Sequence, residues 1–209
     1  GLRAAAAMSA CAGVASAGPI VSSWIGMSGN WTDAMNWSTD PVFPNNGVGQ
    51  TFAVFIDVDQ ADYIVTLDQM ITVDRLDLVG RALGRPTLDL TSNDLVIEGD
   101  FLFDGSTSRP VVFAGGAGGA LEIGGQATLR NSVFEGVGSV TSVGALVFDS
   151  DICDDLCDTP LLLQGDTAQW NGSGDIRLLQ GGSITVSAAT SFTINSAQTL
   201  LDDGVGGAE

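Results

Sequence analysis

Short pairs of apolar residues, spaced two positions apart, recur along the chain from about residue 52 onward. This spacing places both side chains on the same face of a β-strand. Glycine-rich turns separate the pairs, and no stretch after residue 17 shows sustained helical periodicity. The pattern therefore predicts many short strands and an all-β fold. The pairs are Ile71/Val73, Leu76/Leu78, Leu88/Leu90, Leu95/Ile97, Phe101/Phe103, Val111/Phe113, Leu121/Ile123, Leu146/Phe148, Leu161/Leu163, Ile176/Leu178, Ile184/Val186 and Phe192/Ile194.

The length and spacing of these strands favour a solenoid. Most predicted strands have about three to five residues, which is short for a sandwich. Three strands with their turns occupy about 24 residues, a drifting period of the kind that repeat folds show. Comparable pairs recur near Ile71, Leu95, Leu121, Leu146 and Ile184. We therefore expect a right-handed parallel β-helix over residues 52–209 whose coils continue beyond the given sequence, with a β-sandwich or jelly roll as the alternative.

Residues 18–51 differ from the coils because they contain three of the four tryptophans of the chain. Trp24, Trp31 and Trp37 lie in a segment of the pattern W-x-G-x-x-G-N-W…N-W-S, followed by a turn rich in proline and asparagine. The open end of a solenoid exposes its core and its strand edges, so we expect this segment to form an N-terminal cap. The alternative is that Trp31 and Trp37 stack on sugar rings. Trp170 is expected in the core or at a corner.

The tryptophan segment resembles the opening of large bacterial exported β-helix proteins of the autotransporter-passenger or adhesin kind. The resemblance begins at Trp24 and rests on the tryptophan pattern, because the coils that follow are generic. It implies an extended protein that is secreted or displayed on the cell surface.

The first 17 residues support the same location. They combine Arg3, a short alanine-rich run and a small-residue ending, Ala15-Ser16-Ala17. These features predict a truncated signal peptide cleaved after Ala17, with an alanine-rich helix of the folded domain as the alternative. No other segment is a candidate for membrane insertion.

Charge and composition exclude several functions. The chain has 25 acidic and seven basic residues, a formal net charge of −18 and no histidine. Such a chain repels phosphate backbones, so we expect no nucleic-acid partner. The absence of histidine excludes Ser-His-Asp and Cys-His nucleophiles and histidine-ligated zinc.

An acidic stretch provides the main candidate site. Asp149, Asp151, Asp154 and Asp155 could gather around Ca²⁺, which takes six to eight oxygen ligands. The alternative is a solvated loop, and we expect no other cofactor. Cys153 and Cys157 are expected to form a local disulfide if Cys11 leaves with the signal peptide.

These observations favour a non-catalytic structural or adhesive protein whose partners are extracellular glycans or proteins. The alternative is a carbohydrate-active enzyme or glycan-binding module on the same scaffold, which would need carboxylates and an arginine on one face. Two groups of this composition are close in sequence, as expected by chance where aspartate is abundant. They are Asp74, Arg75 and Asp77, and Arg85, Asp89 and Asp94.

Overall fold

The computed structural model describes residues 18–106, 110–115, 118–150, 153–157, 159–165, 167–173, 175–180, 182–188, 190–195 and 199–202. These residues form 22 β-strands and one short 3-10 helix, Ala34–Asn36. The proposed signal peptide, residues 1–17, lies outside the described residues.

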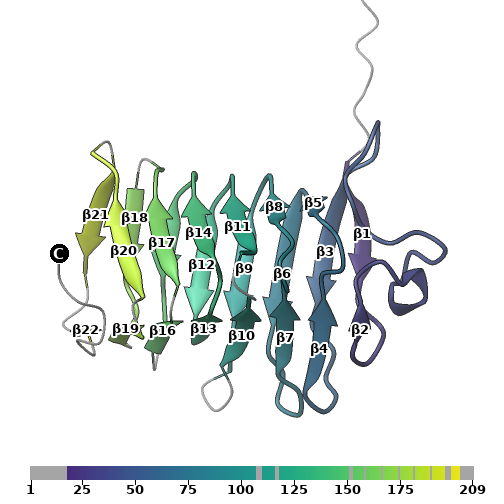
Figure 1. Cartoon of the computed structure of the whole chain (residues 1–209), viewed down its shortest axis with the longest axis horizontal. Coiled ribbons are helices and arrows are strands. Elements are labelled where there is room, and N and C mark those ends of the chain that lie inside the picture. Colours follow the sequence, from purple (N-terminus) through teal and green to yellow (C-terminus); the bar gives the residue numbers. More distant parts are fainter. Residues whose placement is uncertain are drawn as a thin grey trace, which may run out of the picture.

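The strands stack into three parallel sheets that wind together along one axis (Figure 1). The first sheet contains β1 (Ile20–Ser23), β3 (Phe52–Ile56), β6 (Arg75–Val79), β9 (Phe101–Asp104), β12 (Ala127–Arg130), β15 (Leu146–Phe148), β18 (Thr167–Trp170) and β21 (Ser191–Ile194). The second contains β2 (Gly29–Asn30), β4 (Tyr63–Thr66), β7 (Pro86–Asp89), β10 (Val111–Ala114), β13 (Ser132–Glu135), β16 (Cys153–Cys157), β19 (Asp175–Leu179) and β22 (Leu200–Asp202). The third contains β5 (Ile71–Val73), β8 (Leu95–Ile97), β11 (Ala120–Ile123), β14 (Ser139–Ser142), β17 (Pro160–Leu163) and β20 (Ser183–Val186).

Each complete turn of the solenoid contributes one strand to each sheet, and six turns are complete in the described residues. Every named strand pairs in parallel with the strand one turn before or after it, as β6 does with β3 and β9. The prediction of a parallel β-helix is therefore confirmed, and the sandwich alternative is wrong.

The core is built from rows of inward-facing side chains in register from turn to turn. Alternate residues of each strand point inward, and apolar side chains at these positions remove their surface from water. One such row of the first sheet is Ile56, Leu78, Phe103, Leu129, Phe148, Trp170 and Ile194. Trp170 is buried within it, as expected.

One strand of the third sheet was assigned wrongly from the sequence. The equivalent of Leu121 in the next turn is Val140 in β14, whereas Leu146 lies in β15 of the first sheet. The apolar pattern misses β14 because its second inward position holds Ser142. This serine is buried, and its hydroxyl donates to the carbonyl of Gly144 at 3.3 Å.

The corner between the third and the first sheet is a column of glycines, namely Gly99, Gly125, Gly144 and Gly165. A Cβ on Gly144 would meet the backbone oxygen of Gly125, and a Cβ on Gly165 would meet that of Gly144. Successive turns therefore approach so closely at this corner that only glycine fits.

The three tryptophans of the segment 18–51 pack against the interior at the N-terminal end of the solenoid. Trp24, Trp31 and Trp37 are all buried in the same core cluster as the first turns. The Trp37 ring lies 4.9 Å from that of Trp24 in an edge-to-face arrangement and 4.7 Å from that of Trp31. Each indole nitrogen donates to a backbone carbonyl, so no buried donor of these rings is left unsatisfied.

Candidate functional site

The acidic stretch expected to bind calcium is divided between the two faces of a strand. Asp154 and Asp155 are neighbours in β16, so their side chains point to opposite sides. Asp154 takes an inward position, in register with Ser132 and Ile176, whereas Asp155 takes an outward one. Asp149 lies in the turn that follows β15, and Asp151 lies outside the described residues.

Asp154 is a carboxyl group buried inside the solenoid. Its Oδ1 atom accepts hydrogen bonds from the backbone nitrogen of Ser132 at 3.0 Å and from its hydroxyl at 2.6 Å. Its Oδ2 atom is also buried and has no hydrogen-bond partner. Burial raises the pKa of Asp154, while the hydrogen bonds of Ser132 and Ser150 act in the opposite direction.

The other two described carboxylates are paired with arginines. Arg177 in β19 donates from Nε and Nη2 to Asp155, both at 2.6 Å. The same hydrogen bonds raise the pKa of Arg177. Arg130 in β12 donates from Nε to Asp149 at 2.9 Å. Asp149, Asp154 and Asp155 therefore do not converge, and the described residues contain no group of three or more potential metal ligands.

The expected disulfide between Cys153 and Cys157 does not form. These cysteines are the first and last residues of β16, and neither is bonded in a disulfide. Four steps along an extended strand separate their Cα atoms by about 13 Å, whereas a disulfide requires less than about 7 Å. The prediction was wrong because it assumed a loop where the chain forms a strand. Instead, the Sγ atom of Cys153 accepts a hydrogen bond from Arg177 at 3.3 Å.

The alternative role of Trp31 and Trp37 as sugar-stacking residues is also contradicted. Both side chains have an exposed fraction of 0%. Their nitrogens are occupied by Pro44 and Trp31 carbonyls, each at 2.7 Å. Neither ring offers a face to a ligand.

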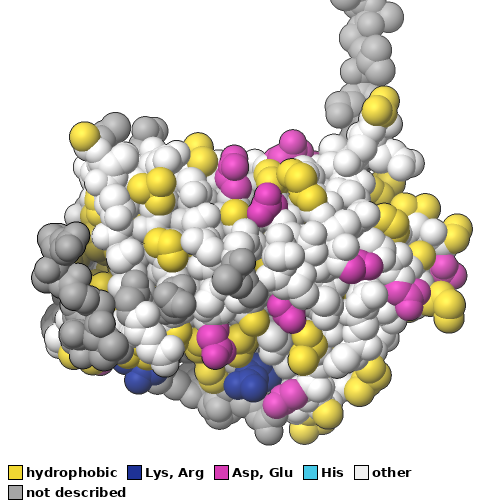
Figure 2. All heavy atoms as spheres, in the orientation of Figure 1, with side chains coloured by type: hydrophobic (Ala, Val, Ile, Leu, Met, Phe, Trp, Pro, Cys, Tyr) yellow, Lys and Arg dark blue, Asp and Glu magenta, His cyan; other side chains and the backbone are white. Residues whose placement is uncertain are grey.

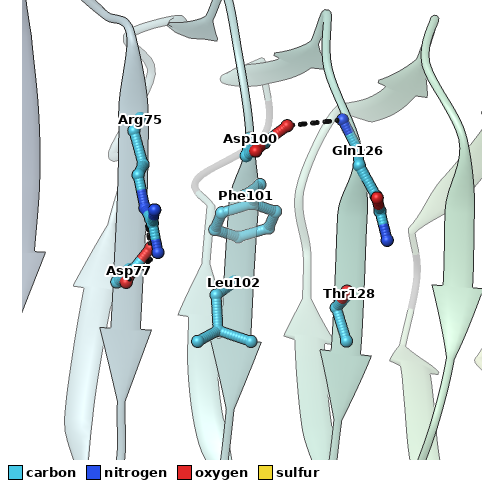
Figure 3. A pocket seen from close by; sticks show the side chains of 7 residues that line it. All are labelled: Arg75, Asp77, Asp100, Phe101, Leu102, Gln126 and Thr128. Carbon is cyan, nitrogen blue, oxygen red and sulfur yellow. Dashed lines mark hydrogen bonds and ion pairs between the residues drawn. The ribbon is translucent and has the colours of Figure 1, made fainter.

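A shallow groove lies on the outer face of the first sheet. Figure 3 shows its seven lining residues, which come from β6, β9 and β12 and the turns that precede β9 and β12. Its volume is about 240 Å³, and a neighbouring hollow of about 590 Å³ toward β1 shares Arg75 and Asp100. Carboxylates, one guanidinium, an amide and a hydroxyl thus line a single stretch of surface.

Arg75 lies on the β6 side of this groove (Figure 3), where the groove meets the neighbouring hollow. Its Nε and Nη2 atoms donate to the two oxygens of Asp77, each at 2.8 Å, and the guanidinium lies 5.7 Å from the ring centre of Phe55. The hydrogen bonds to Asp77 raise the pKa of Arg75. Asp100 accepts a hydrogen bond from the backbone nitrogen of Gln126 at 3.1 Å.

The carboxylates beside the groove also have donors from the chain itself. The side-chain nitrogen of Asn46 donates to Asp74 at 3.0 Å and to Glu98 at 2.8 Å. The carboxylates of this surface and Arg75 are therefore already paired within the chain.

The sequence placed Asp74, Arg75 and Asp77 together but gave no signal for Asp100 and Gln126, which the later turns bring beside them. The second group, Arg85, Asp89 and Asp94, does not form a site. Asp89 accepts a hydrogen bond from the backbone nitrogen of Thr91 at 2.8 Å, and Asp94 accepts one from that of Ala120 at 3.0 Å. Both carboxylates are therefore bound to backbone N–H groups of the solenoid.

The described part of the chain contains no helix that could cross a membrane. Figure 2 shows acidic side chains scattered over one face of the molecule, with few basic ones. No protein-family model matches the chain, and no curated protein or solved structure matches it either. The parallel β-helix is therefore established by the strand pairing alone, without support from a known relative.

Proposed function

We propose that this chain is a non-catalytic β-solenoid of an exported protein, with a structural or adhesive role at the cell surface or outside the cell. The observation that carries the proposal is that Arg130 and Arg177 form ion pairs with aspartates of neighbouring turns. Arg130 lies between Asp104 of the turn before, at 3.6 Å, and Asp149 of the turn after, at 2.8 Å. Arg177 pairs with Asp155 one turn earlier. These pairs link successive turns along the axis, which suits a molecule whose task is to keep its shape.

The placement of the carboxyl groups also supports a non-catalytic role. A glycoside hydrolase generally needs two carboxyl groups that reach the same bond from opposite sides. Asp154, whose pKa burial raises, faces the interior and cannot touch a substrate. In the outer groove, Asp77 is held by both donors of Arg75.

Export remains part of the proposal and rests on the sequence of residues 1–17 and on the tryptophan segment. Extracellular glycans or proteins are the partners that such a location provides. A net charge of −18 disfavours nucleic acids. N-terminal sequencing of the secreted protein tests export, and the expected first residue is Gly18. Recovery of the protein only inside the cell, with residues 1–17 still attached, would contradict export.

Turnover assays test the absence of catalysis. The purified chain is incubated with neutral and acidic polysaccharides, with and without Ca²⁺, and new reducing ends and unsaturated products are measured. We expect no turnover above that of a heat-denatured sample. Turnover that is lost in Asp77→Asn or Asp100→Asn would overturn the proposal and place an active site in the outer groove.

The second candidate is a glycan-binding module, which the outer groove favours. Its carboxylates and amide can accept and donate hydrogen bonds to sugar hydroxyls, and Leu102 and Thr128 offer an apolar and a polar contact beside them. Glycan-array binding that is lost in Arg75→Ala but kept in Arg81→Ala, whose arginine lies outside the groove, would support this candidate.

A further inference from the structure

The outer groove and its neighbouring hollow form one trough along the axis of the solenoid. The two share Arg75 and Asp100, and their lining includes residues of β3, β6, β9 and β12. Neighbouring strands of a sheet are about 4.8 Å apart, so these four strands span about 14 Å. An extended chain of about four or five residues covers the same length.

The charges of this trough are unbalanced. Its lining contains the carboxylates of Asp74, Asp77, Glu98 and Asp100 but one basic side chain, that of Arg75. Two hydrogen bonds of 2.8 Å join Arg75 to Asp77, so the charges of these two side chains cancel. Among the described residues, none of the other three carboxylates forms an ion pair with an arginine.

Neutral groups of the chain hold these three carboxylates in place. The side-chain nitrogen of Asn46 donates to both Asp74 and Glu98, at 3.0 and 2.8 Å, and therefore holds two like charges side by side. Asp100 accepts from the backbone nitrogen of Gln126 at 3.1 Å. An amide satisfies one carboxylate oxygen but does not cancel the negative charge. Since like charges repel at this distance, a cation that enters the trough is stabilised by all three.

A row of outward-facing side chains lies beside the carboxylates. Phe55, Asp77, Leu102 and Thr128 are in register on successive strands of the first sheet. Phe55 and Leu102 are half-buried and offer apolar surface, and Thr128 offers a hydroxyl (Figure 3). The trough therefore has an acidic margin and a partly apolar floor.

We propose that this trough binds an extended basic segment of a partner protein. Lysine or arginine side chains of the segment lie against Asp74, Glu98 and Asp100, and its apolar side chains lie against Phe55 and Leu102. Alternate side chains of an extended chain point to opposite sides, so one segment contacts both the margin and the floor.

The complementary charge decides between this occupant and others. A second copy of the chain is disfavoured, because the chain has 25 acidic and seven basic residues and the two copies would repel each other. A single metal ion is disfavoured because the described residues contain no group of three or more potential ligands.

This inference rests on the adhesive form of the proposed function, since it names the chemistry of the partner. It differs from the glycan-binding candidate in the expected effect of Arg75→Ala. That change removes donors for sugar hydroxyls, but it also leaves Asp77 free to attract a cation, so the affinity for a basic segment should rise. If no basic segment binds, the structural form of the proposed function still stands, because the export and turnover assays do not depend on peptide binding.

Isothermal titration calorimetry of the full chain tests the trough with the peptide acetyl-Lys-Leu-Lys-Leu-Lys-amide. We expect one peptide to bind per chain, with an affinity that falls as the salt concentration rises. The neutral peptide acetyl-Asn-Leu-Asn-Leu-Asn-amide should bind about ten-fold more weakly or less tightly still, because it loses every ion pair.

The variant Asp100→Asn assigns the binding to the trough. Asparagine keeps an acceptor for the backbone nitrogen of Gln126 but loses the charge, so the affinity should fall by about two- to five-fold. The matched control is Asp94→Asn. Asp94 also accepts from a backbone nitrogen of the next turn, that of Ala120 at 3.0 Å, but lies outside the trough. The two variants change the net charge equally, and the control should keep the wild-type affinity.

Glu98→Gln serves as a second variant if Asp100→Asn does not fold, as judged by circular dichroism. Glutamine keeps an acceptor for the amide of Asn46, and the affinity should fall by a similar factor. Absence of binding, equal losses in a trough variant and in Asp94→Asn, or a lower affinity in Arg75→Ala would each overturn the proposal.

Discussion

The indole nitrogen of Trp37 donates a hydrogen bond of 2.7 Å to the backbone carbonyl of Trp31, and both rings are completely buried. This bond holds Trp37 against Trp31. The indole nitrogen of Trp31 in turn donates a hydrogen bond to the backbone carbonyl of Pro44. These two bonds and the packing of the rings hold a segment without a long strand or helix against the core of the first turns.

Replacement of Trp37 should separate the packing of this segment from its hydrogen bond. Trp37→Ala leaves a cavity and should lower the free energy of unfolding by about 3–5 kcal/mol. Trp37→Phe keeps most of the ring but loses the bond to Trp31, and should cost less. Urea denaturation measures both values. If Trp37→Ala were as stable as the wild type and instead lost glycan binding, the assignment of Trp37 to a cap would be wrong.

Asp154 should make the stability depend on pH in the direction opposite to a paired carboxylate. Burial raises its pKa in the folded state above the unfolded value. Its contribution is therefore fully present below the unfolded pKa, about 3.9, and is lost as the pH rises through the folded pKa. The Asp154→Asn variant cannot ionise at this position. As the pH rises from 4 to 7, its melting temperature should therefore increase relative to that of the wild type. Parallel melting profiles of the two proteins over this range would contradict the burial of an ionisable group.

The glycine column predicts a position-specific sensitivity to alanine. Gly144→Ala places a Cβ against the backbone oxygen of Gly125 in the turn before, and backbone cannot yield as a side chain can. We expect a loss of about 1–3 kcal/mol in the free energy of unfolding. Gly47→Ala is the matched control, since a Cβ on Gly47 meets nothing within 4 Å. Equal stabilities of the two variants would show that the turns are not stacked this closely.

The pair between Arg177 and Asp155 should be worth more than a surface ion pair. The Asp155 side chain is 10% exposed and receives two hydrogen bonds from Arg177, which is itself 40% exposed and therefore partly screened by solvent. Arg177→Gln should cost about 1–2 kcal/mol. Arg81→Gln breaks the pair with Asp57, in which the two side chains are 47% and 40% exposed, and should change stability by less than about 1 kcal/mol. Thermal denaturation measures the loss of stability in both variants. A larger loss in Arg81→Gln than in Arg177→Gln would contradict the role given to Arg177.

The fold could be predicted from the sequence where the inward positions are apolar. All twelve predicted pairs face the interior, because spacing by two directly reflects the alternation of side chains in a strand. The pattern failed where an inward position holds a polar residue, as Ser142 does in β14 and Asp154 does in β16.

The candidate site could not be predicted, for a different reason. Arg75 and Asp77 are two positions apart and share a face, which the sequence indicates. Asp100 and Gln126 join them only through the register of later turns. That register depends on turn lengths that vary, for example 26 residues between Asp94 and its partner Ala120 but 19 between Arg130 and Asp149. Apolar spacing alone does not determine these lengths.

Hydrogen exchange of the whole chain most directly tests whether one continuous interior holds the turns together as a scaffold. We expect the amides of β6 to β17 in all three sheets to exchange in one slow class. The tryptophan segment should be protected with them, and β21 and β22 should exchange faster. Rapid exchange of one sheet, or of residues 24–37, while the remaining strands stay protected would contradict a single capped solenoid.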